Sequence, residues 1–355
     1  MSGLPNIARA GLLTAATTLV LINAAAARAQ QFFPEIIISS TIPANGDLNP
    51  YGVAFVPPGF PSGGPLEPGD ILVSNFNNSG NLQGMGSTII KLRPNRLVAP
   101  AVPAGMSGNA ITFFQPPPGS PTLGLTTALG VLRAGFVLVG NVPTLTKAAT
   151  CTGGPGGQER GVGHGSLLVL DAHGNLVREL RDPALLDGPW DLTVSDGGDS
   201  ASVFVSNVLN GTVTRVDLSL EGGSFAVLGM TRIASGYAHR CDPAALVVGP
   251  TGLALDEDGG LLVASTGDNA IYAVQDPFGG TDGGTGRVVV QDQVHLHGPL
   301  GLARASNGDL ITSQGDAVNP DAAQPSEIVE YTAGGSFVAQ FSIDPAPGSA
   351  FGLAL

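Results

Sequence analysis

An all-β fold is predicted by three features of the sequence. Glycine (52 residues) and proline (28 residues) are abundant in the 355-residue chain, and both disfavour helices. The chain is nevertheless 43% hydrophobic and only 12% charged, which excludes an ordinary disordered protein. Its apolar residues fall in many short runs separated by turn residues, and this pattern is typical of an all-β domain.

The N-terminus is predicted to be a secretory signal peptide over residues 1–29. Arg9 supplies positive charge, an apolar core follows over residues 11–22, and Ala27-Arg28-Ala29 fits the small-x-small cleavage pattern. This core is shorter than the roughly 20 residues that span a bilayer, so cleavage after Ala29 is favoured over an uncleaved anchor. We therefore expect an exported protein, either periplasmic or extracellular.

The charge of the chain argues against nucleic acid as a partner. The formal net charge is −13 and Lys and Arg together number only 15, so no basic stripe is available to neutralise phosphates. An acidic, lysine-poor surface favours solubility and repels anionic membranes. We expect a monomer with no membrane span once the signal is removed.

The two cysteines, Cys151 and Cys241, both lie in segments that contain glycine or proline. Export would place them in an oxidising compartment, where a disulfide can form. The sequence does not set the distance between their Cα atoms. A disulfide between them and two free thiols therefore both remain open.

A repeat organises most of the chain. Each copy begins with Pro-x-Gly-(Val/Leu)-Ala and continues with a Gly-containing turn, an apolar run that ends in small residues, a second turn and a second run. Successive copies begin 72, 67, 61, 49 and 51 residues apart, and the shorter intervals match the ~40–50 residues of a four-stranded propeller blade. Clear copies begin at Pro50, Pro250 and Pro299, degenerate copies at Thr122 and Pro189, and a sixth start at Ala350.

These repeats predict a β-propeller over residues 49–355. A four-stranded sheet with two apolar faces can bury both only against neighbouring sheets, so the repeats must close radially. Two short predicted strands remain for the last blade. One lies at 35–42, within an N-terminal segment 30–48, and the other at 350–355. We expect a six-bladed plan with an incomplete closing blade, and five blades is the alternative.

The motifs resemble the NHL-type repeat propellers, and more distantly the gluconolactonase/senescence-marker and streptogramin-lyase propellers. The resemblance implies a fold rather than one function, because these propellers include enzymes and scaffolds. In gluconolactonase-like members it implies a divalent cation held by Asn or Asp just before the repeat glycine, since such cations need oxygen ligands. None of the residues at these positions here is a carboxylate or amide: Tyr51, Leu123, Trp190, Thr251, Leu300 and Phe351.

Amidating-lyase-like propellers hold zinc with several channel histidines, and this chain has five histidines. Zinc needs three or four converging ligands. His295 and His297 form the only local pair, and alternation would place both on one face of a strand. They are weak metal candidates, because His297-Gly-Pro-Leu-Gly also fits the start of an ordinary repeat. We expect no metal and no other cofactor.

The channel mouth is the predicted ligand site. Apolar walls with a few polar groups are typical of small-molecule pockets, although packing between blades also explains such residues. The sequence favours a non-catalytic binding module for a protein or for a small apolar or glycan ligand; a lyase or lactonase acting at the central channel is the alternative. The candidate ligand-binding residues are Tyr51, Trp190, Asp191, Thr251, Leu300 and Phe351.

Overall fold

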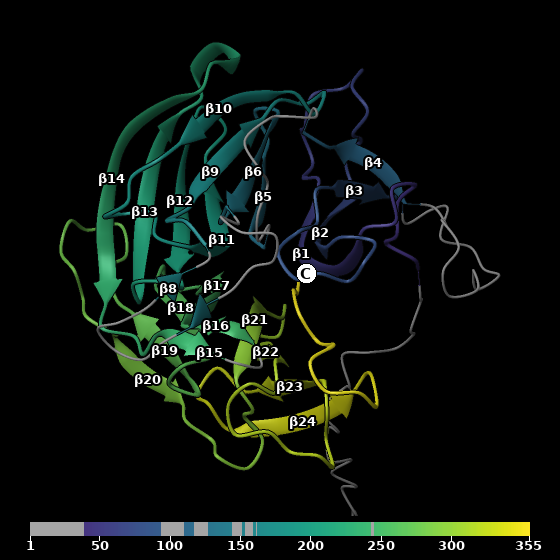
Figure 1. The fold of residues 1–355 in the computed structure, drawn as a ribbon. Helices are drawn as coiled ribbons and strands as arrows, with labels where there is room; N and C mark the ends of the chain where they lie inside the picture. Colours follow the sequence, from purple (N-terminus) through teal and green to yellow (C-terminus); the bar gives the residue numbers. More distant parts are fainter. Residues whose placement is uncertain are drawn as a thin grey trace, which may run out of the picture. The chain divides into compact units, whose positions relative to one another are not determined.

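Five four-stranded antiparallel sheets stand around a common axis in the computed structural model (Figure 1), which confirms the predicted β-propeller. Residues 37–355 form one compact unit. None of the described residues form a helix that is long and apolar enough to cross a bilayer. The structure describes residues 39–93, 110–116, 127–143, 151–152, 159–160, 162–242 and 245–355, with the backbone alone at 151–152 and 159–160.

The strands of each sheet follow one another from the axis outward. The first sheet contains β1 (Leu48–Phe55), β2 (Ile71–Asn77), β3 (Ile89–Leu92) and β4 (Ile111–Phe114). The second contains β5 (Leu129–Leu132), β6 (Phe136–Asn141), β9 (Ser166–Leu170) and β10 (Leu176–Leu180). The third contains β11 (Pro189–Asp196), β12 (Ser200–Asn207), β13 (Thr212–Ser219) and β14 (Ala226–Ser235).

The remaining two sheets and two short hairpins complete the described strands. The fourth sheet contains β17 (Pro250–Leu255), β18 (Leu261–Ser265), β19 (Ala270–Val274) and β20 (Arg287–Val290). The fifth contains β21 (Pro299–Arg304), β22 (Leu310–Gln314), β23 (Glu327–Tyr331) and β24 (Phe337–Ser342). The hairpins are β7 (Cys151–Thr152) with β8 (Glu159–Arg160), and β15 (Arg240–Asp242) with β16 (Leu246–Val248).

The core lies between neighbouring sheets. Every residue of β6 and of β18 is buried, as expected for a strand covered on both faces. One apolar cluster joins the second and third sheets through residues such as Val169 and Val203. Similar clusters join the first sheet to the second, the third to the fourth and the fourth to the fifth. This arrangement explains why the sequence runs are continuously apolar rather than alternating.

Residues 350–355 occupy a sixth position around the axis, although they form no regular strand. The Ser313 hydroxyl of β22 donates a hydrogen bond to the Phe351 carbonyl oxygen. On the other side, Gly352 packs so closely against β1 that a Cβ there would lie 2.0 Å from the Tyr51 carbonyl oxygen. Figure 1 shows the C-terminus beside β1. The chain therefore returns to its first inner strand through a residue without a side chain.

The predicted N-terminal strand at 35–42 is not seen in its described part. Residues 39–42 are not in a strand. The Thr41 carbonyl oxygen instead accepts a hydrogen bond from the Asn75 side chain at 3.0 Å, and Pro43, which has no N–H, follows. Residues 35–38 lie outside the described residues.

The second repeat begins later than its sequence suggests. Strand pairing aligns Leu129 of β5 with Val53 of β1. The residue just before the repeat glycine is therefore Thr127, and Ala128 replaces the glycine. The prediction of Leu123 at this position was wrong, because a Leu-Gly-Leu sequence shortly before β5 imitates the motif; Leu123 itself lies outside the described residues.

Candidate functional site

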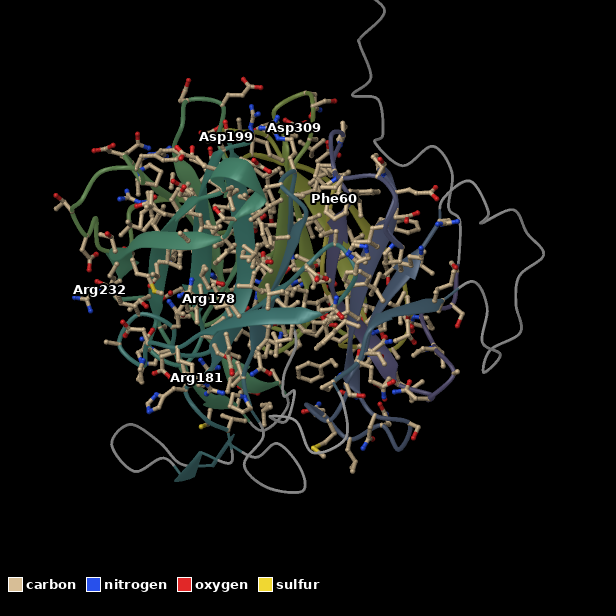
Figure 2. The ribbon with its side chains drawn as sticks, turned by 90° about the horizontal axis from the view of Figure 1, so that it is seen from above. Phe60, Arg178, Arg181, Asp199, Arg232 and Asp309 are labelled. Atoms are coloured by element: carbon tan, nitrogen blue, oxygen red, sulfur yellow. The ribbon has the colours of Figure 1, made fainter. Side chains whose placement is uncertain are left out.

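A cavity lies at each end of the inner strands. Residues from the start of the inner strands line one of about 470 Å³, which we call the mouth cavity, and residues from their far ends line one of about 820 Å³. In Figure 2, Phe60, Asp199 and Asp309 mark the face of the turns that leave the inner strands, and Arg181 lies toward the opposite face. The β15–β16 hairpin contributes Ala245 and Val247 to the mouth cavity.

Four aromatic side chains form a cluster along one wall of the mouth cavity. The ring of Tyr51 lies 4.9 Å from Phe351, 5.6 Å from Phe76 and 5.5 Å from Trp190 between centroids. The Trp190 Nε1–H donates to the Tyr51 hydroxyl at 2.8 Å. Burial raises the pKa of Tyr51 above its ordinary value, so the hydroxyl stays protonated. The cluster is thus rigid, and Tyr51 keeps its own O–H as a donor.

Four of the six predicted site residues line the mouth cavity: Tyr51, Trp190, Leu300 and Phe351. Trp190 is only 3% exposed and also packs in an apolar cluster with Val208. It is therefore partly a core residue, as the packing alternative anticipated. Phe76, close to the end of β2, also lines the cavity and was not predicted, because the repeat position marks residues of inner strands alone; its aromatic side chain was the available signal.

Thr251 does not line the mouth cavity. Its side chain is buried, and its hydroxyl donates to the Pro299 carbonyl oxygen of the next inner strand at 2.9 Å. Thr127 makes the equivalent contact with the Pro189 carbonyl oxygen at 3.4 Å. These two threonines therefore join neighbouring sheets; the repeat predicted the place of Thr251 but neither the place of Thr127 nor these contacts.

Asp191 lies between the cavities and links the third sheet to the fourth. Its Oδ2 accepts a hydrogen bond from the Leu253 N–H of β17 at 2.9 Å. Elsewhere the repeat glycine touches the next inner strand directly: a Cβ at Gly252 would lie 2.4 Å from the Leu302 nitrogen. Burial raises the pKa of Asp191 to about 7, although backbone N–H groups of Leu253 and Leu192 oppose this shift. At this position the Asp191 carboxyl group therefore joins the two strands, whereas a glycine brings them into direct contact in other repeats.

The raised pKa of Asp191 predicts that stability falls as the pH rises. The folded state holds this proton up to about pH 7, whereas the unfolded chain loses it near pH 3.9. The stabilisation that comes from protonated Asp191 is therefore complete below about pH 4 and is lost as the pH rises through 7. Asp191→Asn keeps an acceptor for Leu253, so we expect it to match the wild type at pH 4 and to exceed it at pH 8. At pH 8 we expect the free energy of unfolding of Asp191→Asn to exceed that of the wild type by on the order of 2 kcal/mol. This is less than the full pKa shift would give, because Asp191 is partly exposed. Urea unfolding at both pH values tests this, with the exposed Asp258→Asn as control; equal pH profiles would contradict the assignment.

The predicted histidine pair does not lie on a strand. Residues 293–295 form a turn between β20 and β21, because the Asp292 carboxylate accepts the Val294 N–H at 2.8 Å and competes with strand pairing. His295 stacks on Phe337 with centroids 3.8 Å apart. His297 is buried, and its Nδ1 bonds to the Glu327 carboxylate. Within the described ranges, no three His, Cys, Asp or Glu side chains gather in a metal-binding group.

Cys241 lies in β15 and is disulfide-bonded. The β7 strand, which contains Cys151, lies beside β15. The Cys151 side chain is outside the described part of the chain, so a disulfide between Cys151 and Cys241 stays one of the two alternatives that the sequence left open.

The fold resembles solved propeller structures at low sequence identity. No family model and no curated protein matches the chain. A streptogramin B lyase is 14% identical with a TM-score of 0.47, over 87% of this chain and 74% of that one. A nidogen/laminin complex is 11% identical with a TM-score of 0.47, over 82% and 79%. Regucalcin, a calcium-binding protein from Agrobacterium tumefaciens, is 14% identical with a TM-score of 0.45, over 84% and 75%. These likenesses concern the fold alone.

Proposed function

We propose that this propeller is an exported, non-catalytic binding module that takes a small apolar molecule into the mouth cavity. The observation that carries the proposal is an aromatic wall around a cavity of about 470 Å³. This volume falls within the roughly 300–1,000 Å³ that is usual for small-molecule sites. Apolar side chains such as Leu300 and Val247 form much of the remaining surface.

The geometry of the aromatic wall supports a preformed site. Phe76 and Trp190 lie edge to face with centroids 6.3 Å apart, and the Trp190–Tyr51 hydrogen bond fixes both rings. A rigid site loses little conformational entropy when it binds, which favours affinity. Loops that connect the sheets, including the β15–β16 hairpin, surround this opening, and binding residues are often found on such loops.

Binding can be tested with N-phenyl-1-naphthylamine, a neutral compound whose fluorescence rises in apolar surroundings. We expect saturable binding at one site, accompanied by a change in the fluorescence of Trp190, the one Trp of the chain. Ala317 lines the cavity, so Ala317→Phe should fill it and weaken binding at least tenfold. The exposed Ala333 lies elsewhere, and Ala333→Phe should bind like the wild type.

Three results would contradict the proposal. Unsaturable binding, or equal affinity in Ala317→Phe, would place the compound outside the mouth cavity. Chemical conversion of ligands recovered from the purified protein would contradict a non-catalytic role. Isolation of the secreted protein with an N-terminus other than Gln30 would contradict the proposed signal cleavage.

A further inference from the structure

One charged side chain, Asp316, lines the mouth cavity among the residues that the structure describes there. The other polar lining side chains are neutral, and Lys, Arg and His are not among them. An anionic ligand would therefore meet a carboxylate, with no basic side chain among the described lining residues to offset the repulsion. A cationic ligand would meet its counter-ion in surroundings where water is partly excluded, which strengthens the attraction.

The Asp316 carboxylate is held in place from one side only. Its Oδ2 accepts hydrogen bonds from the Ser326 N–H at 2.9 Å and the Gly348 N–H at 3.0 Å. Its backbone has φ of 53°, and its N–H donates to the His297 carbonyl oxygen at 3.1 Å. By contrast, Oδ1 is buried and has no hydrogen-bond partner. A buried acceptor without a donor is costly, and a positive charge held beside this carboxylate would offset part of that cost.

A second carboxyl group, that of Glu327, lies near Asp316. Glu327 is fully buried, and its Oε1 bonds to His297 Nδ1, whereas its Oε2 has no partner. Burial raises the pKa of Glu327, the His297 hydrogen bond opposes this shift, and the nearby Asp316 charge adds to it. These two groups therefore repel one another, and a cation beside Asp316 relieves that repulsion.

We propose that the mouth cavity selects protonated organic amines with an apolar body, with Asp316 as the counter-ion. This inference rests on the proposed function and names its ligand class. The aromatic rings of Tyr51, Phe76 and Phe351 supply apolar surface for the body, and aromatic faces also attract ammonium groups. The acidic net charge of −13 favours the approach of cations over anions.

Three matched compounds test the inference by calorimetry at pH 7 and low salt. They are 1-naphthylmethylamine, 1-naphthalenemethanol and 1-naphthoate, which share one apolar body and differ in charge. We expect the amine to bind at least tenfold more tightly than the alcohol, and the carboxylate to bind most weakly. In Asp316→Asn the amine should fall to the affinity of the alcohol, while the affinity of the alcohol stays unchanged. Asp321→Asn, on the same loop but outside the cavity lining, should keep the wild-type order.

The outcomes separate the two proposals. Equal affinities of the three compounds for the wild type, or an amine preference that survives in Asp316→Asn, would overturn the inference and leave a neutral apolar site. Failure of all three compounds and of N-phenyl-1-naphthylamine to bind would instead overturn the proposed function. The comparison of compounds on the wild type does not depend on the variant, so it decides the inference even if Asp316→Asn fails to fold.

Discussion

Gly352→Ala is expected to lower the free energy of unfolding by about 3 kcal/mol. The added methyl carbon would lie 2.0 Å from the Tyr51 carbonyl oxygen and 3.3 Å from a Val53 methyl group, and the backbone cannot yield without separating the chain end from β1. Forcing atoms into a filled space typically costs this much. Urea unfolding followed by Trp190 fluorescence measures the loss.

The matched control for this substitution is Gly229→Ala. Gly229 lies in β14, and a Cβ there meets nothing within 4 Å, so stability should change by less than about 0.5 kcal/mol. If Gly352→Ala were as stable as this control, residues 350–355 would not close the ring as described.

Trp190→Ala is expected to cost about 3–5 kcal/mol, the usual loss when a large buried aromatic side chain is truncated. Trp190 contacts Tyr51 and Phe76 and packs with Val208 and Leu209. Its removal would leave a void between residues of the first, second and third sheets, beside the mouth cavity. Differential scanning calorimetry measures the loss without requiring Trp fluorescence.

Two variants help to interpret this result. Leu228→Ala removes a side chain that is 69% exposed and should leave stability nearly unchanged. Trp190→Phe removes the hydrogen bond to Tyr51 and should lower stability. Because it keeps an aromatic ring in the cluster, the loss should be smaller than in Trp190→Ala. Unchanged stability in Trp190→Ala would show that this side chain serves ligand contact alone, contrary to its burial.

The propeller could be predicted because its repeat reflects a simple physical requirement. Most inner strands have a small residue where they meet the next strand, and the Pro-x-Gly pattern marks it at Gly52, Gly252 and Gly301. The second copy was placed wrongly because Ala128 meets the same need without glycine or a preceding proline. Small size, rather than glycine itself, allows the direct contact, and β11 reaches its neighbour through Asp191 instead.

The mouth cavity could be predicted only in part. Position in the repeat places Tyr51 and Phe351 near the axis, but it does not show whether a side chain points into the cavity or toward the next sheet. Thr251 is short enough to bond to the neighbouring strand, and Asp191 extends to Leu253. Asp316 lies on a loop beyond β22, where no periodic pattern exists to indicate its place.

The contacts between inner strands have a consequence for how such repeats can change during evolution. A Cβ at Gly52, Gly252, Gly301 or Gly352 would meet main-chain atoms of the following repeat, and Asp191 likewise bonds to a main-chain N–H. Main-chain atoms are present whatever the side chain, so the inner strand of one repeat does not require particular residues in the inner strand of the next. Duplication or exchange of repeats therefore leaves these junctions intact, and the loops around the opening are free to diversify.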